Sequence, residues 1–353
     1  MPLRVSDTRP KTKARARPKR GSNDAVSTKW LFYAQCFEVR YDFTRASTLQ
    51  IPAEKNLILI GVPTYQRPAM LQKCLSGLAA LEGLDAYRVE CLIVDNDAAG
   101  SARAVITTFA PSAPWPLHYV IEPARGLVCV RNRVLEEAVL RDATYLACID
   151  DDEWPAPVWL ARHVEALVKF NAEVATGPVI PIAANEITPP RVGGGKARRR
   201  TGEQPRHVAC NNVVFHRRLI AEQSLRFDSR YNFIGGEDFD FFDSSQTLGN
   251  KHVWVADATV FETIPPERQT ARYIFKRHFS GGINSVVFYR KRHGRVATWN
   301  YFTLRALGKL LSASVVLPLC ALSAQHRSRV LKRVANALGF ISGLFKFSVE
   351  RYR

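Results

Sequence analysis

Short apolar runs alternate with segments of helical periodicity through the middle of the chain. Residues 56–63 form an apolar run that ends in proline, which is typical of a buried strand. In the segment 67–82 the apolar positions recur every three or four residues, and Pro68 stands in the expected first turn of a helix. The alternation continues, with strands expected at 89–95, 117–122 and 145–150 and helices at 126–141 and 158–171.

This alternation predicts an α/β fold with a mostly parallel sheet that helices cover on both faces. Such sheets bind ligands at the carboxyl ends of their strands. Polar and charged residues directly follow three of the expected strands, at 64–67, 95–97 and 150–153. We therefore expect the chemistry of the protein at this edge of the sheet.

The two ends of the chain differ from this central body. Residues 1–29 are rich in Lys, Arg, Pro and Ser without apolar periodicity, so we expect a disordered basic tail. Residues 30–55 form an extension that matches no pattern we can assign. Residues 310–324 carry no charge, but they are fewer than the ~20 residues that span a bilayer.

The segment 327–345 has the pattern of an amphipathic helix. One of its faces is apolar, and most of its bases lie elsewhere. Such a helix either lies on a membrane surface or packs against its own domain. We expect residues 291–353 to form a helical, membrane-associating region. The apolar face comprises Val330, Val334, Leu338, Ile341 and Phe345.

The composition narrows the classes of protein. With 46% hydrophobic residues, the chain can build a core and is not disordered as a whole. The net charge is +18, but residues 1–20 contribute +7 and residues 325–353 contribute +6, which leaves +5 for the 304 residues between. A nucleic-acid enzyme would carry its excess along a groove of the folded body, so we expect no nucleic-acid partner. The seven cysteines lack a CxxC pair and are interpreted as reduced residues of a cytosolic protein.

Four successive acids follow the strand expected at 145–150. Carboxylates this close repel one another unless solvent or a cation neutralises them. A solvated loop would satisfy the pattern. So would Mg²⁺ or Mn²⁺, which take one or two carboxylates together with waters and phosphate oxygens. The acids are Asp150, Asp151, Asp152 and Glu153.

Two further motifs carry candidate chemistry. The segment 235–241 places acids between aromatic residues after a glycine pair, which suits a general base in a partly apolar site. The same segment also fits a helix N-terminus whose acids complement the dipole. Gly126 precedes an expected helix that carries Arg131, and this offers amides and a charge to a phosphate group. An arginine on the protein surface without a ligand would show the same pattern.

The order and spacing of five strings is more informative than any one of them. VPTYQR, VDND, GLVCVRN, DDDEWP and GGEDFDFF follow one another along the chain. Together they resemble the family 2 glycosyltransferases, and among these the bacterial exopolysaccharide β-glucosyltransferases of the succinoglycan type. The resemblance covers about residues 56–290. Two positions depart from the usual pattern, since Val130 precedes Arg131 where alanine is common and Glu153 replaces a more frequent aspartate.

The resemblance implies a GT-A fold, a nucleotide-diphosphate sugar donor, with a UDP-sugar favoured, and a Mg²⁺ or Mn²⁺ ion. It implies that Asp238 is the catalytic base and that Asp152 is the metal ligand. Asp95 would hydrogen-bond the pyrimidine of the nucleotide. The remaining residues implied to bind the nucleotide sugar are Thr64, Tyr65, Arg67, Arg131, Asp150, Asp151 and Glu237. A later basic motif near the diphosphate has four candidates, Arg272, Lys276, Arg277 and His278.

These residues suit an inverting transfer, in which the base accepts the proton of the acceptor hydroxyl while the ion and Arg131 stabilise the leaving diphosphate. We expect a saccharide acceptor, lipid-linked, at the cytoplasmic face of the cell membrane, in the synthesis of a surface polysaccharide. The basic carboxyl end would be attracted to anionic lipid there. Two alternatives remain. A non-catalytic module that binds anionic lipid or nucleic acid would leave the five strings without a role. A nucleotidyltransferase would usually carry a glycine-rich basic loop where this chain has PTYQR.

Overall fold

A computed structural model describes residues 55–183, 199–318 and 323–345. The predictions for residues 1–29 and for 30–54 concern residues outside these ranges. The prediction of a mostly parallel sheet is confirmed, and the expected strands and helices agree with the structure to within three residues at each end. The elements in question are β1 Leu57–Thr64, α1 Pro68–Ala79, β2 Arg88–Asp95, β3 Leu117–Ile121, α3 Leu127–Leu140, β4 Tyr145–Cys148 and α4 Trp159–Phe170.

The main sheet has seven strands in the order β3-β2-β1-β4-β8-β6-β9. The four strands from β1 to β4 are mutually parallel, while β8 is antiparallel to both of its neighbours. Sequence periodicity did not indicate this antiparallel strand, because a short buried run has the same pattern in either direction. The added strands are β6 Val174–Thr176, β8 Val213–His216 and β9 His252–Trp254.

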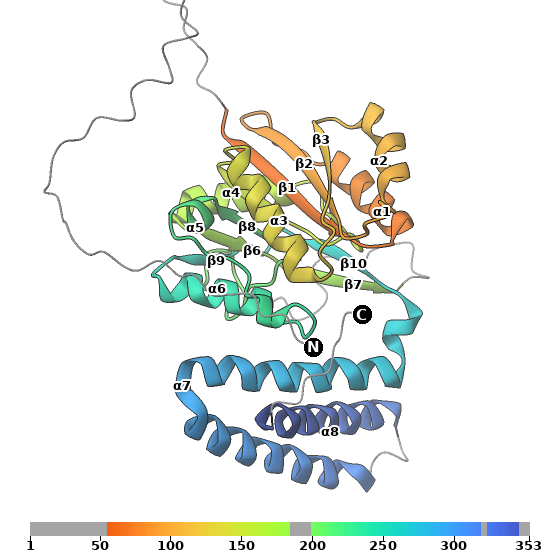
Figure 1. Cartoon of the computed structure of the whole chain (residues 1–353), viewed down its shortest axis with the longest axis vertical. Coiled ribbons are helices and arrows are strands. Elements are labelled where there is room, and N and C mark those ends of the chain that lie inside the picture. Colours follow the sequence, from red (N-terminus) through yellow and green to blue (C-terminus); the bar gives the residue numbers. More distant parts are fainter. Residues whose placement is uncertain (1–54, 184–198, 319–322, 346–353) are drawn as a thin grey trace, which may run out of the picture. The chain divides into compact units, whose positions relative to one another are not determined.

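Helices cover both faces of this sheet (Figure 1). In β1, Ile58 and Ile60 pack with α1, α4 and the short helix α2 (Arg103–Phe109). Leu57 and Leu59 point to the opposite face, where they pack with α3, α5 (Arg218–Ala221) and α6 (Glu237–Thr247). Successive side chains of a strand alternate between faces, so one apolar run supplies two cores. All five cysteines in the described ranges are free, and four of them are buried.

A second, three-stranded sheet begins directly after the acid string. Its order is β5-β10-β7, with β10 antiparallel to β5 and parallel to β7. Glu153 is the first residue of β5 and is paired in register with Glu262 of β10. This pairing brings a segment more than a hundred residues distant next to the acids. The strands are β5 Glu153–Pro155, β7 Val179–Ala183 and β10 Val260–Ile264.

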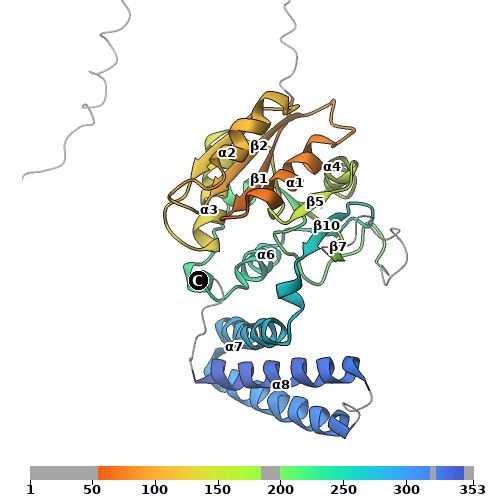
Figure 2. The same cartoon turned by 90° about the vertical axis from the view of Figure 1, so that its right-hand side faces the viewer.

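Two long helices complete the described chain. Helix α7 (Ala271–Val316) bends at Gly294, whose φ is 74°, and α8 (Ala324–Leu344) packs against it. Figures 1 and 2 show the first part of α7 next to α6, on the side of α6 away from the sheet, with α8 beyond it. Helix α7 runs through position 291, where the sequence suggested that the helical region starts. No helix of the described ranges is long and apolar enough to cross a membrane.

The helix expected at 327–345 is present, but only part of its expected apolar face packs on α7, where the ring of Phe345 meets that of Trp299 edge to face at 5.1 Å. Phe340 and Leu344 are buried together with two alanines of α8. Leu338, Ile341 and Phe345 of the expected face are 40%, 37% and 59% exposed. Small residues also bring α8 close to α7, since a Cβ on Gly339 would lie 2.1 Å from the carbonyl oxygen of Phe279.

Candidate active site

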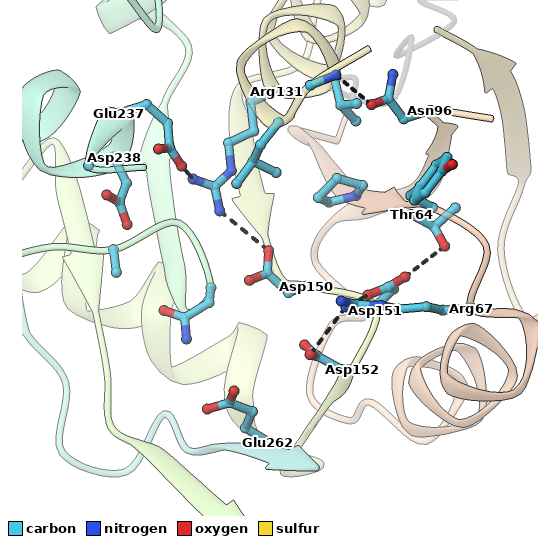
Figure 3. A pocket seen from close by; sticks show the side chains of 18 of the residues that line it. Thr64, Arg67, Asn96, Arg131, Asp150, Asp151, Asp152, Glu237, Asp238 and Glu262 are labelled. Atoms are coloured by element: carbon cyan, nitrogen blue, oxygen red, sulfur yellow. Dashed lines mark hydrogen bonds and ion pairs between the residues drawn. The ribbon is translucent and has the colours of Figure 1, made fainter. Parts of the chain in front are cut away.

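A cavity of about 570 Å³ opens at the carboxyl ends of β1 and β4. The amino ends of α3 and α6 form part of its wall (Figure 3), and Tyr273 and Arg277 from the first turns of α7 complete it. Of the residues implied to act as base, metal ligand or nucleotide-sugar contact, all except Asp95 line this cavity, so the fold brings together residues from positions 64 to 238. They are Thr64, Tyr65, Arg67, Arg131, Asp150, Asp151, Asp152, Glu237 and Asp238.

Asp95 faces away from the cavity. It is fully buried, and its carboxylate accepts the backbone N–H groups of Asp97 at 3.0 Å and of Ala102 at 2.8 Å. The Tyr119 hydroxyl donates a third hydrogen bond at 2.9 Å. The carboxylate therefore holds the loop after β2, and the neighbouring residue Asn96 lines the cavity in its place.

Asn96 shapes the entry to α3. Its amide nitrogen donates to the carbonyl oxygens of Glu122 at 2.9 Å and of Ala124 at 2.7 Å. Its amide oxygen accepts the N–H of Gly126 at 2.8 Å. Gly126 has φ 123°, a backbone conformation that favours glycine, and it precedes the first residue of α3. These bonds place the amino end of α3 at the cavity.

Cations neutralise the acid string. Asp151 accepts the hydroxyl of Thr64 at 2.8 Å and lies 3.2 Å from the Arg67 guanidinium. Asp152 lies 3.4 Å from Arg67 and 2.7 Å from Arg268. Burial raises the pKa of Asp151 to about 6, while Arg67 and the Thr64 hydroxyl act in the opposite direction. Positive charges on two separate segments, those of Arg67 and Arg268, thus face the acids.

Arg131 joins the two acidic motifs. Its guanidinium contacts Glu237 of α6 and lies 3.5 Å from Asp150, and the side chain is almost fully buried (Figure 3). Burial raises the pKa of Glu237 to about 7, against the effect of Arg131. Arg131 is therefore the electrostatic link between the strand-end acids and the helix that carries Asp238.

Asp238 lies in the first turn of α6, on the same side of the cavity as Glu237 (Figure 3). Gly236 caps this helix with φ 92°, and one oxygen of Asp238 accepts the N–H of Phe239 at 2.7 Å. The segment therefore agrees with both sequence interpretations, because acids of a helix N-terminus also line the cavity. A carboxylate in this position can accept a proton from a hydroxyl bound in front of it.

The donor set suits a hard cation that a bound phosphate helps to hold. Within the described residues, no group of three or more His, Cys, Asp or Glu side chains is arranged to hold a metal ion alone. Mg²⁺ needs no such group, since it binds through one or two carboxylates, waters and phosphate oxygens. Asp152 already faces two guanidinium groups, which marks its carboxylate as a position that attracts positive charge.

Several lining residues were missed by sequence reasoning. Of the four basic candidates near position 275, only Arg277 lines the cavity. Besides Arg67, Asp152 contacts Arg268, from the short 3₁₀ helix Pro266–Gln269, and Arg268 also lies 2.9 Å from Glu262. No local pattern marks these residues, because they reach the site through the second sheet. The other missed lining residues include Arg125, Asn211 and Tyr273, whereas Asn96 falls within the strand-end segment 95–97 that the sequence indicated.

Comparison with known proteins defines the class first. The structure is similar to that of the mannosyltransferase PcManGT from Pyrobaculum calidifontis, which was solved in complex with GDP-Man and Mn²⁺. The TM-score is 0.56 at 18% sequence identity, and the match covers 83% of this chain and 88% of that one. The fold is thus of the glycosyltransferase GT-A type. A lower similarity, with a TM-score of 0.48 and 14% identity, relates 80% of this chain to 90% of S. aureus TarS 1-349.

The sequence comparisons give the family. Residues 59–224 match the model of Glycosyl transferase family 2. Over 315 residues the chain is 31% identical to the succinoglycan biosynthesis protein ExoM of Rhizobium meliloti (strain 1021), with 86% of this chain and 97% of that protein covered. The chain belongs to glycosyltransferase family 2.

Proposed function

We propose that this protein is an inverting, metal-dependent glycosyltransferase that moves glucose from UDP-glucose, or a closely related donor, to a hydroxyl group of a saccharide. The observation that carries the proposal is the single cavity that contains both Asp238 and the acid string, with Arg131 between them. The name of the relative ExoM, a succinoglycan biosynthesis protein, supports a role in exopolysaccharide synthesis. The complex of PcManGT with GDP-Man and Mn²⁺ supports a nucleotide-sugar donor and a divalent ion.

The donor would occupy the half of the cavity between β1 and α3. Tyr65 and Arg125 form its rim, with the Arg125 guanidinium 4.0 Å from the Tyr65 ring centre and a 2.7 Å hydrogen bond to its hydroxyl. The amino end of α3 and Arg131 offer positive charge to a diphosphate. Asp152 would hold the ion, and a bound Mg²⁺ or Mn²⁺ would stabilise the charge of the leaving diphosphate.

The acceptor hydroxyl would approach from the side of α6. Asp238 removes its proton as the oxygen bonds to the anomeric carbon and the bond from that carbon to the diphosphate breaks. One displacement of this kind inverts the configuration at the anomeric carbon. A second carboxylate that acts as nucleophile is not needed.

Calorimetric titration with UDP, GDP and ADP tests the donor site. We expect binding selective for UDP in the presence of Mn²⁺ and much weaker binding in EDTA. Asp152→Ala should remove this dependence on the metal. A folded protein that binds none of the nucleotides would overturn the donor site and favour the non-catalytic module. Equal binding of UDP in EDTA would overturn the dependence on the metal.

Asp238→Asn tests the base. We expect turnover to fall by about two to four orders of magnitude while UDP binding stays close to wild type. Asp243→Asn is the matched control, because Asp243 lies on the same helix, pairs with Arg292 and does not line the cavity. Turnover that persists in Asp238→Asn would remove the base assignment.

We also propose that the protein docks on the cytoplasmic face of the cell membrane, where a lipid-linked acceptor would be found. The second half of α7 supports this, because Leu304, Leu307, Leu311 and Val315 recur with helical spacing and are between 53% and 77% exposed. Exposed bases of α8 accompany them, which suits anionic lipid.

Flotation with liposomes of phosphatidylcholine and phosphatidylglycerol tests the docking. The double variant Leu307→Ser/Leu311→Ser should leave the lipid fraction, whereas Leu140→Ser, at an equally exposed leucine of α3, should remain in it. Equal flotation of both variants, or flotation with pure phosphatidylcholine alone, would refute the proposed surface.

A further inference from the structure

A second cavity of about 380 Å³ lies between α6 and the helical layer of α7 and α8. Gly236 lines both this cavity and the candidate active site. Phe239, the residue after Asp238, forms part of its wall. A molecule bound in the second cavity therefore lies next to the helix turn that carries the proposed base.

Aromatic rings form most of this wall. Tyr289 and Tyr301 come from the two halves of α7 and stack with ring centres 4.6 Å apart and an angle of 1° between their planes. Phe239 and Phe288 meet edge to face at 4.4 Å. The bend of α7 at Gly294 is what brings the two tyrosines together. Rigid rings in this arrangement offer faces and edges on which the C–H groups of a sugar ring can pack.

Polar groups stand among the rings. The Asn284 side chain donates to the carbonyl oxygen of Ile234 at 2.9 Å, which fixes its amide. Its buried amide oxygen has no hydrogen-bond partner among the described residues. Arg305 donates to the Tyr301 hydroxyl at 2.6 Å and also lines the cavity. A buried acceptor without a partner is costly, and a donor from a ligand would satisfy it.

We propose that this cavity binds the acceptor saccharide, holding the sugar unit next to the one whose hydroxyl faces Asp238. An isoprenoid chain would be served by apolar walls alone, whereas an oriented amide, an arginine and two tyrosine hydroxyls match the hydroxyl groups of a sugar. The inference rests on the proposed function, since the position of Asp238 defines the reacting end of the acceptor.

Saturation-transfer NMR tests the cavity with methyl β-cellobioside, methyl β-lactoside and farnesyl phosphate as probes. We expect transfer to at least one disaccharide and none to farnesyl phosphate. Tyr289→Ala and Phe288→Ala should weaken disaccharide binding by roughly three- to tenfold, the loss that corresponds to one aromatic contact.

A blocking variant keeps the test independent of packing. Ser285 is exposed and lines the cavity, so Ser285→Trp fills the space without removing core contacts, and it should abolish disaccharide binding. Val296→Trp is the matched control, since Val296 is 76% exposed on the same helix and does not line the cavity.

Calorimetry with UDP, run on the same samples, separates this inference from the proposed function. UDP binding without disaccharide binding would overturn the acceptor cavity alone. So would disaccharide binding that Ser285→Trp leaves intact. A farnesyl phosphate signal that Ser285→Trp removes would identify a lipid cavity instead. Disaccharide binding without UDP binding would support the cavity and refute the donor site.

Discussion

Replacing Arg131 by methionine tests the electrostatic link at the centre of the site. Methionine keeps much of the length and apolar volume of the arginine but removes its charge. Arg131 is 7% exposed and Glu237 is 3% exposed, so little water can replace the lost partner. Removing one member of a buried ion pair typically costs about 3–5 kcal/mol of unfolding free energy. We expect the loss of unfolding free energy in Arg131→Met to lie in this range at pH 8.

The loss should depend on pH in a defined direction. Burial raises the pKa of Glu237 to about 7 even with Arg131 present, and without Arg131 that pKa must rise further. A carboxyl group whose folded pKa lies above its unfolded value of about 4.3 destabilises the fold as it ionises. The free energy of unfolding then falls as pH rises through that window. A carboxyl with a pKa of about 7 is mainly protonated at pH 5, so Arg131→Met should lose about 1 kcal/mol less stability at pH 5 than at pH 8.

Urea unfolding at both pH values measures this effect in wild type, Arg131→Met, Glu237→Gln and the double variant. The double variant should recover the part of the loss that depends on pH, because position 237 then carries no charge, while Asp150 still lacks the guanidinium of Arg131. Equal losses at pH 5 and pH 8 would refute the reasoning, as would a loss below about 1 kcal/mol at pH 8.

Three further predictions concern residues that support the site. Lys291→Met leaves buried Asp240 without the ammonium group 2.7 Å away, so the free energy of urea unfolding should fall by about 2 kcal/mol. Adding Asp240→Asn should restore most of that stability. Gly126→Ala should lower the free energy of unfolding by about 2 kcal/mol and weaken UDP binding, because φ is 123° and the new Cβ would lie 2.1 Å from the Asn232 side chain. A thermal unfolding midpoint equal to that of wild type would contradict this. Burial lowers the pKa of His163 to about 4, so its contribution to the unfolding free energy should fall by about 3 kcal/mol between pH 7 and pH 4. The difference in unfolding free energy between wild type and His163→Gln should change by that amount between the two pH values.

The local elements and the general place of the site could be predicted because their signals are local. An apolar run such as 57–62 and the helical spacing of 68–79 follow from neighbouring residues alone. In a parallel sheet the carboxyl ends of the strands meet at one edge, so Thr64 and Asp151 were expected near each other, and they share a 2.8 Å hydrogen bond. The five ordered strings carried the family, which the comparisons confirm.

The partners of these residues were decided by the tertiary structure. Asp95 and Asn96 are adjacent in sequence, but only Asn96 lines the cavity. The carboxylate of Asp95 instead accepts backbone N–H groups of the loop after β2. Arg268 reaches Asp152 only because β10 pairs with β5. The second cavity exists because α7 bends at Gly294. Strand pairing and helix packing bring together residues that are far apart in sequence. Local periodicity, on which the sequence predictions depend, carries no information about such contacts.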